Sequence, residues 1–195
     1  GAREGRFGRK GEKRSMQPFA ASSIPLVTLG TFLLWFGWFG FNGFSQLAMG
    51  TFDDVNAISK IAVNTHLAGA AGTFTGAVLT RLIGGKTDIV MMLNGALAGL
   101  VAITAEPLTP GPITAMMIGS IGAIIMYFGT KMLESYGLDD VVGAIPVHMF
   151  AGIFGTLVVP LSNGDTSFGT QLLGVISVVV FSFILSYGVF SGLKT

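Results

Sequence analysis

Two side chains near the start of the chain, Phe41 and Ser45, have types and a spacing that suit a small cation. They lie four residues apart, so an α-helix would place them on one face, one turn from each other. An aromatic ring attracts a cation to its face, and a hydroxyl oxygen accepts a hydrogen bond from it. Such residues also occur where helices pack through a bulky aromatic seam. Both interpretations are open at the level of sequence.

His148 is a second candidate for chemistry. It stands in an otherwise apolar segment, V-V-G-A-I-P-V-H-M-F-A-G-I-F-G, and a titratable ring is costly in hydrocarbon, so we expect it to face protein or a cavity. Gly152, one turn further on, leaves space beside the ring. Pro146 has no backbone N–H to donate to the Val142 carbonyl, which frees an acceptor nearby. The pattern fits a functional residue and equally a buried histidine bonded to a backbone carbonyl.

Few other side chains could carry chemistry. His66 lies beside Asn64 and Thr65, and we interpret it as a structural residue. Two histidines and no cysteine argue against a metal site, since transition metals usually take three or four protein ligands. We find no nucleophile–base pair, nucleotide-binding loop or pair of catalytic carboxylates, and therefore expect neither an enzyme nor a cofactor. A net charge of +1 with localised basic residues gives no groove for nucleic acid.

The elements that must position these residues are membrane helices. Half of the 195 residues are apolar and 11% are charged, and residues 29–45 hold seven aromatics and four glycines without a charge. Such a segment fits a helix that spans a bilayer. We expect an all-α membrane protein with six transmembrane helices. The expected helices are residues 24–47, 57–83, 89–105, 113–136, 141–161 and 168–190.

A glycine motif and two pairs of aspartates add detail to the expected helices. The third expected helix contains G-A-L-A-G, a Gly-x-x-x-Gly face for close helix packing. Asp53 and Asp54 are expected in the loop after the first helix. Asp139 and Asp140 are expected to begin the fifth helix, where carboxylates complement the helix dipole and cap free N–H groups.

Basic residues predict the orientation of the chain. Residues 1–14 carry six of the eleven Lys and Arg residues, and threading six helices from a cytoplasmic start leaves only Lys60 outside. We therefore expect residues 1–23 to form a basic cytoplasmic loop and residues 24–193 to form a transmembrane domain. Both ends of the chain would then be cytoplasmic in a multi-pass protein of the cell membrane.

Five motifs, in one order, resemble the ammonium transporter family (Amt/Mep/Rh). They are F-G-W-F-G-F-N-x-x-S ending at Ser45, N-T at 64–65, N-G-A-L-A-G-L-V-A-I-T at 94–104, D-D at 139–140, and P-V-H-x-x-x-G-I-x-G at 146–155. The resemblance runs from about residue 5 to the last residue. It implies the second half of such a transporter, its sixth to eleventh helices. That half is one copy of an inverted repeat plus the last helix.

The resemblance also implies roles. Phe41 matches the family's gating phenylalanine, Ser45 its recruitment-site serine, and His148 one of two pore histidines. The implied function is transport of ammonium or ammonia across the bilayer, in a homotrimer that includes the N-terminal half. The alternative is the membrane ammonium-sensing module of a signalling protein. Two departures concern Phe44, where the family usually has a small residue, and Gly143, where it often has an aspartate.

Overall fold

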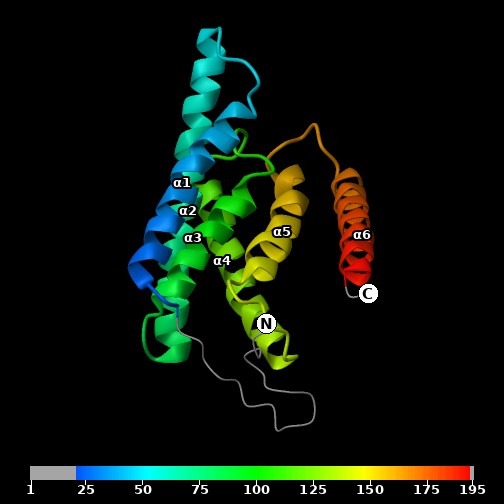
Figure 1. Cartoon of the computed structure of the whole chain (residues 1–195). Helices are drawn as coiled ribbons and strands as arrows, with labels where there is room; N and C mark the ends of the chain where they lie inside the picture. Colours follow the sequence, from blue (N-terminus) through cyan, green and yellow to red (C-terminus); the bar gives the residue numbers. More distant parts are fainter. Residues whose placement is uncertain (1–20, 194–195) are drawn as a thin grey trace.

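The computed structural model describes residues 21–193, and all regular structure in that range is helical. The expected fold class, all-α, is confirmed in this respect. Helices gather side by side except for the last, which stands apart (Figure 1). In chain order the elements are α1 Ile24–Phe44, α2 Phe52–Gly84, α3 Ile89–Ile103, α4 Pro112–Ser135, the π-helical turn η1 Ile145–Phe150, α5 Ala151–Val158, the 3₁₀ turn η2 Val159–Leu161 and α6 Phe168–Gly192. The expected basic loop at residues 1–23 lies almost entirely outside the described residues.

Four of these helices, α1, α2, α4 and α6, are long and apolar enough to cross a membrane. The other two apolar helical stretches are shorter. α3 has 15 residues, which corresponds to about 22 Å, less than the roughly 30 Å of a hydrocarbon core. The second is the continuous stretch Ile145–Leu161. The structure therefore supports a multi-pass membrane protein with four clear candidate spans in residues 21–193.

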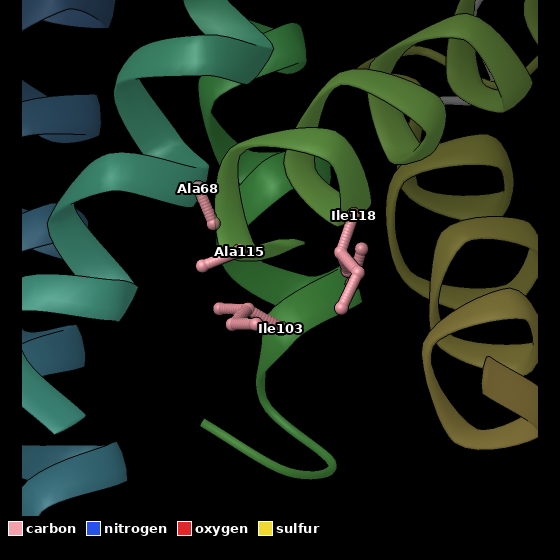
Figure 2. Packing of buried hydrophobic residues seen from close by; sticks show 5 residues of the cluster. Ala68, Ile103, Ala115 and Ile118 are labelled. Atoms are coloured by element: carbon pink, nitrogen blue, oxygen red, sulfur yellow. The ribbon is translucent and has the colours of Figure 1, made fainter. Parts of the chain in front are cut away.

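Small residues bring α2, α3 and α4 into backbone contact. A Cβ added at Gly72 would overlap the carbonyl oxygen of Gly95, and one at Gly119 would overlap the carbonyl oxygen of Ala68. The packing face expected in the third helix is thus confirmed. A compact apolar cluster fills the region beside these contacts, as Figure 2 shows. Its members include Ala68, Ala102, Ile103, Ala115 and Ile118.

The first helix ends at Phe44, three residues earlier than expected. Past this point the backbone N–H of Ser45 donates to the Asn42 carbonyl, three residues back, at 3.2 Å. Such a bond tightens the last turn of a helix. Leu47 then adopts φ +60°, which no α-helix continues. Ser45 is therefore the C-terminal cap of α1 and does not lie within it.

The second helix begins at Phe52, five residues earlier than expected. Its N-cap is Thr51: the Thr51 hydroxyl accepts from the Asp54 N–H at 3.2 Å, and the Asp54 carboxylate accepts from the Thr51 N–H at 3.0 Å. This reciprocal pair is a capping box. The expectation that Asp53 and Asp54 lie in the preceding loop is wrong, because both belong to the first turn of α2.

The fifth helical stretch begins at Ile145 and not at residue 141. The delay follows from Gly143, whose φ of +75° interrupts helical backbone. The expected capping by an aspartate is nevertheless confirmed for Asp140. Its carboxylate oxygens accept from the N–H groups of Ala144 at 2.9 Å and Ile145 at 2.8 Å.

The last helix, α6, is the one element that the described chain leaves almost uncovered. None of its residues is buried, and among the described elements it contacts only α5 and η2. Figure 1 shows it reached by a long loop and separated from α1 to α4. Its apolar side chains are therefore free to meet lipid or another polypeptide.

Candidate functional site

Phe41 and Ser45 meet at the end of α1, as their spacing predicts. The Ser45 hydroxyl donates to the Phe41 carbonyl at 2.9 Å. Because its proton is committed to that bond, the hydroxyl presents only lone pairs to a ligand. The Phe41 ring is 63% exposed and lies against Trp38, with ring centroids 5.9 Å apart. The pair thus offers a ring face and an oxygen acceptor on the surface of the described chain.

The electrostatics of this position favour a cation. Ser45 caps the C-terminal end of a 21-residue helix, where the helix dipole is negative. A donor-only ion such as a small ammonium-type cation can give hydrogen bonds to the free lone pairs of this hydroxyl. Because α1 ends three residues earlier than expected, the negative end of its dipole lies at Ser45 and favours cation binding there. The sequence pattern alone did not reveal this contribution.

Two side-chain bonds fix the end of α1 against the bundle. Trp38 Nε1 donates to the Thr104 hydroxyl, at the end of α3, at 2.7 Å. Asn42 Nδ2 donates to the Thr65 hydroxyl on α2 at 3.0 Å, with both side chains buried. These anchors face inward while Phe41, between them in the sequence, stays exposed. The orientation of the candidate cation site is thus set by α2 and α3.

Phe44 adds a second exposed ring beside Ser45. Its ring lies back along α1, within ordinary contact of the position that a Cβ at Gly40 would take, at 3.5 Å. The glycine leaves room for this arrangement. Phe44, which departs from the expected small residue, therefore alters the surface next to Ser45. It does not alter the packed side of α1.

His148 is exposed and lies in the π-helical turn η1. The interpretation of a buried histidine bonded to a carbonyl is wrong, because within residues 21–193 its ring has no hydrogen-bond partner. Its neighbours Pro146 and Val147 are buried instead, with Val147 packed beside Met126 in an inner cluster. The turn therefore holds its preceding residues inward and directs the imidazole out of the packed core. A π-helical turn of this kind is frequent at functional sites.

The carbonyl that Pro146 leaves free does find a donor. Asn94 Nδ2, on α3, donates to the Val142 oxygen at 3.1 Å. The sequence predicts the free acceptor but not its partner, which is 48 residues away. No local signal identifies the donor, because Asn94 is an amide inside the apolar helix α3.

His66 lies elsewhere, on α2 facing α1. Its ring is tilted against Trp35, with centroids 5.5 Å apart, and stacked on Phe39 at 6.3 Å. These contacts fit the structural role expected from the sequence. That role stays a prediction.

The structure does not bring the three candidate residues into one pocket. α1 makes no contact with η1 or α5 among the described elements. The end of α1 and the π-helical turn lie at different heights of the bundle in Figure 1. Phe41 and Ser45 therefore form one position and His148 another, separated along the length of the helices.

Comparison with known proteins identifies the family. Residues 1–195 match the Ammonium Transporter Family. The ammonium transporter Amt2 of Archaeoglobus fulgidus is 48% identical over 112 residues, which cover 57% of this chain and 24% of that protein. The Amt2 of Methanocaldococcus jannaschii is 33% identical over 189 residues, 93% of this chain and 42% of its own length. The chain thus spans less than half the length of these curated relatives.

Solved structures agree with this match. A protein described as a sensor Amt protein superposes with a TM-score of 0.81 at 34% identity, covering 89% of this chain and 44% of its own. Candida albicans Mep2 superposes with a TM-score of 0.80 at 27% identity, covering 89% and 41%. With a family match over every residue and the same fold in its solved relatives, the chain belongs to the ammonium transporter family.

Proposed function

We propose that these residues form part of a membrane transporter for ammonium or ammonia, in which Phe41, Ser45 and His148 line the path of the substrate. The observation that carries the proposal is the position of His148, an exposed imidazole in a π-helical turn of an apolar stretch, whereas the other histidine, His66, packs on aromatic rings of α1. An imidazole facing bare hydrocarbon is costly, so this face calls for a polar or protein-lined path beside it. The family match supplies the substrate.

The resemblance to the ammonium transporters implies an order for the three side chains, and physical chemistry supports it. Ser45 would accept a hydrogen bond from ammonium while the Phe41 ring attracts its charge. A bare cation is very costly to move through an apolar pore, whereas a neutral molecule of the size of water is much cheaper. Ammonium would therefore give up its proton near the outer site, and ammonia would pass Phe41, the gate, and continue beside His148.

The proposed assembly rests on the uncovered faces of the described chain, on the distribution of basic residues and on the resemblance to the ammonium transporters. The uncovered faces of η1 and α6 suit a partner polypeptide, and the chain spans 42% or less of the two curated relatives above. We infer six membrane passes in residues 24–193, a basic cytoplasmic loop at residues 1–23, and both ends on the cytoplasmic side. The inferred assembly is a homotrimer in which each protomer also contains the N-terminal half of the family fold.

Transport by a chimera tests this function. Residues 1–195 replace the matching segment of M. jannaschii Amt2, and the chimera is produced in cells that lack ammonium transporters. We expect ammonium-dependent growth and methylammonium uptake. Residues 1–195 alone, with His148 uncovered, should give neither. A chimera that reaches the membrane in normal amount yet never transports would contradict the proposal, and growth with residues 1–195 alone would contradict the inferred assembly.

A sensing role is the second candidate. Its specific support is the likeness to the sensor Amt protein, which has 34% identity and the same fold. A sensor needs to bind ammonium but does not need to move it. The chimera separates the two functions, because binding measured by calorimetry without uptake of methylammonium would favour sensing.

A further inference from the structure

We propose that Asn94 is a positioning residue for His148, and that it works by holding the Val142 carbonyl at the entry to η1. The importance of Asn94 for transport rests on the proposed function. The effect of Asn94 on the position of His148 can be tested separately. Asn94 lies on α3, whereas His148 lies in η1, so the residue acts through the backbone and not on the substrate.

The first step is the free carbonyl. Gly143, with φ +75°, interrupts helical backbone between Val142 and η1, so the Val142 carbonyl lies outside the helix. Asn94 Nδ2 donates to this carbonyl at 3.1 Å. The bond is exposed, and it ties the segment just before η1 to α3, whose next residues Gly95 and Ala96 are buried.

The second step is the fit between Asn94 and Gly143. Gly143 has φ +75°, and a Cβ placed there would lie 2.8 Å from Asn94 Nδ2. The glycine is therefore needed for its backbone angle and for the space that the amide fills.

The third step leads from this anchor to the imidazole. Asp140 holds the N–H groups of Ala144 and Ile145. At the other end of the turn, the Ala151 N–H reaches back to the Pro146 carbonyl, five residues earlier. His148 lies between these two fixed ends. A change at the Asn94 anchor is thus expected to rotate the turn and move the imidazole.

A cysteine at position 148 reports on this position directly. The chain contains no cysteine, so His148→Cys introduces a single thiol in a chimera whose recipient part is also cysteine-free. The measurement is the rate at which a water-soluble maleimide modifies this thiol. Asn94→Ala and Asn94→Asp, which both lose the amide donor, should change the rate by about threefold or more.

Asn94→Gln provides the decisive second variant. It keeps an amide donor at this exposed position, on a side chain one methylene longer. Its modification rate should lie within about twofold of the parent rate. Asn64→Ala is the matched control, because Asn64 Nδ2 donates to the carbonyls of Pro107 and Pro110, far along the chain from η1. It should leave the modification rate unchanged even where it lowers stability.

Transport by the same series, with His148 retained, completes the test. Asn94→Ala should lower the maximal rate of methylammonium uptake with little change in KM, and Asn94→Gln should retain it. An unchanged thiol rate in Asn94→Ala, or an equal effect in Asn94→Gln, would overturn the inference. If the thiol rates respond as expected but the parent chimera does not transport, the positioning role stands and the proposed function fails.

Discussion

The indole Nε1 of Trp38 donates to the hydroxyl of Thr104 at 2.7 Å, across 66 residues of sequence. This bond joins the end of α1 to the end of α3, and the Trp38 ring also supports the exposed ring of Phe41. The candidate cation site is therefore built on a tertiary contact and not on α1 alone.

Trp38→Phe should destabilise the chimera by about 1 kcal/mol, because it keeps an aromatic ring but leaves Thr104 without its donor. Thermal unfolding of the purified protein measures the effect. Trp35→Phe is the matched control, since Trp35 Nε1 is buried without a hydrogen-bond partner within residues 21–193. This substitution breaks no hydrogen bond, so its cost should be limited to the packing lost with the smaller ring. Equal losses in both variants would mean that the bond to Thr104 contributes nothing.

Glu106→Gln should loosen two loops at once and cost about 1–2 kcal/mol. One carboxylate oxygen of Glu106 accepts from the N–H groups of Leu108 and Thr109, and the other accepts from Asn163 Nδ2 at 2.8 Å. A glutamine turns its own amide toward that of Asn163, whose oxygen is already engaged by the Asp165 N–H.

The matched control for Glu106 is Asp165→Asn, which changes an exposed acid in the second of these loops. Its effect should stay within about 0.5 kcal/mol. Thermal unfolding again provides the comparison. Two indistinguishable melting curves would show that the carboxylate of Glu106 is not a link between the loops.

Hydrogen bonds between distant segments, such as those of Trp38 and Glu106, could not be predicted from the sequence. The helices follow from long apolar stretches, and the family motifs locate Phe41, Ser45 and His148. The start of α2 was readable in principle, because Thr51 and Asp54 have the spacing of a capping box. The end of α1 was not, since no glycine or proline marks it and the stop depends on the backbone angle of Leu47.

The surroundings of the site depend on contacts between distant segments. Pro146 predicts that the Val142 carbonyl lacks a backbone donor. No residue near it in the sequence indicates that Asn94 is the donor. The exposure of His148 likewise results from which residues of η1 pack inward. The apolar sequence around His148 fits a functional residue and a buried histidine equally, whereas in the structure the buried side chains there are those of Pro146 and Val147.

The membrane topology should follow the basic residues. We expect reporters fused after Gly50, Pro110 and Asp165 to be outside the cell, and reporters after Gly85 and Leu138 to be inside. Ten of the eleven Lys and Arg residues then face the cytoplasm, as the positive-inside bias requires. Paired reporters that are active on opposite sides of the membrane give the measurement, and an inverted pattern would refute both the orientation and the six-pass arrangement.

His148 should matter more for transport than His66 in the chimera. With His148→Ala we expect methylammonium uptake to fall by about tenfold or more, equivalent to about 1.4 kcal/mol, because the polar side of the path is lost. His66→Ala should act through folding, since its ring packs on Trp35 and Phe39. The cost of losing these contacts is about 1 kcal/mol. Uptake is compared at equal amounts of protein in the membrane.

His66→Phe sharpens this comparison, because a phenyl ring preserves the contacts with Trp35 and Phe39 while removing the titratable nitrogens. It should restore both the stability and the uptake of the His66→Ala variant. If His66→Phe abolished uptake at normal membrane levels while His148→Ala did not, the substrate path would run along the α1–α2 side of the bundle. The family motifs would then describe the fold of this chain without its mechanism.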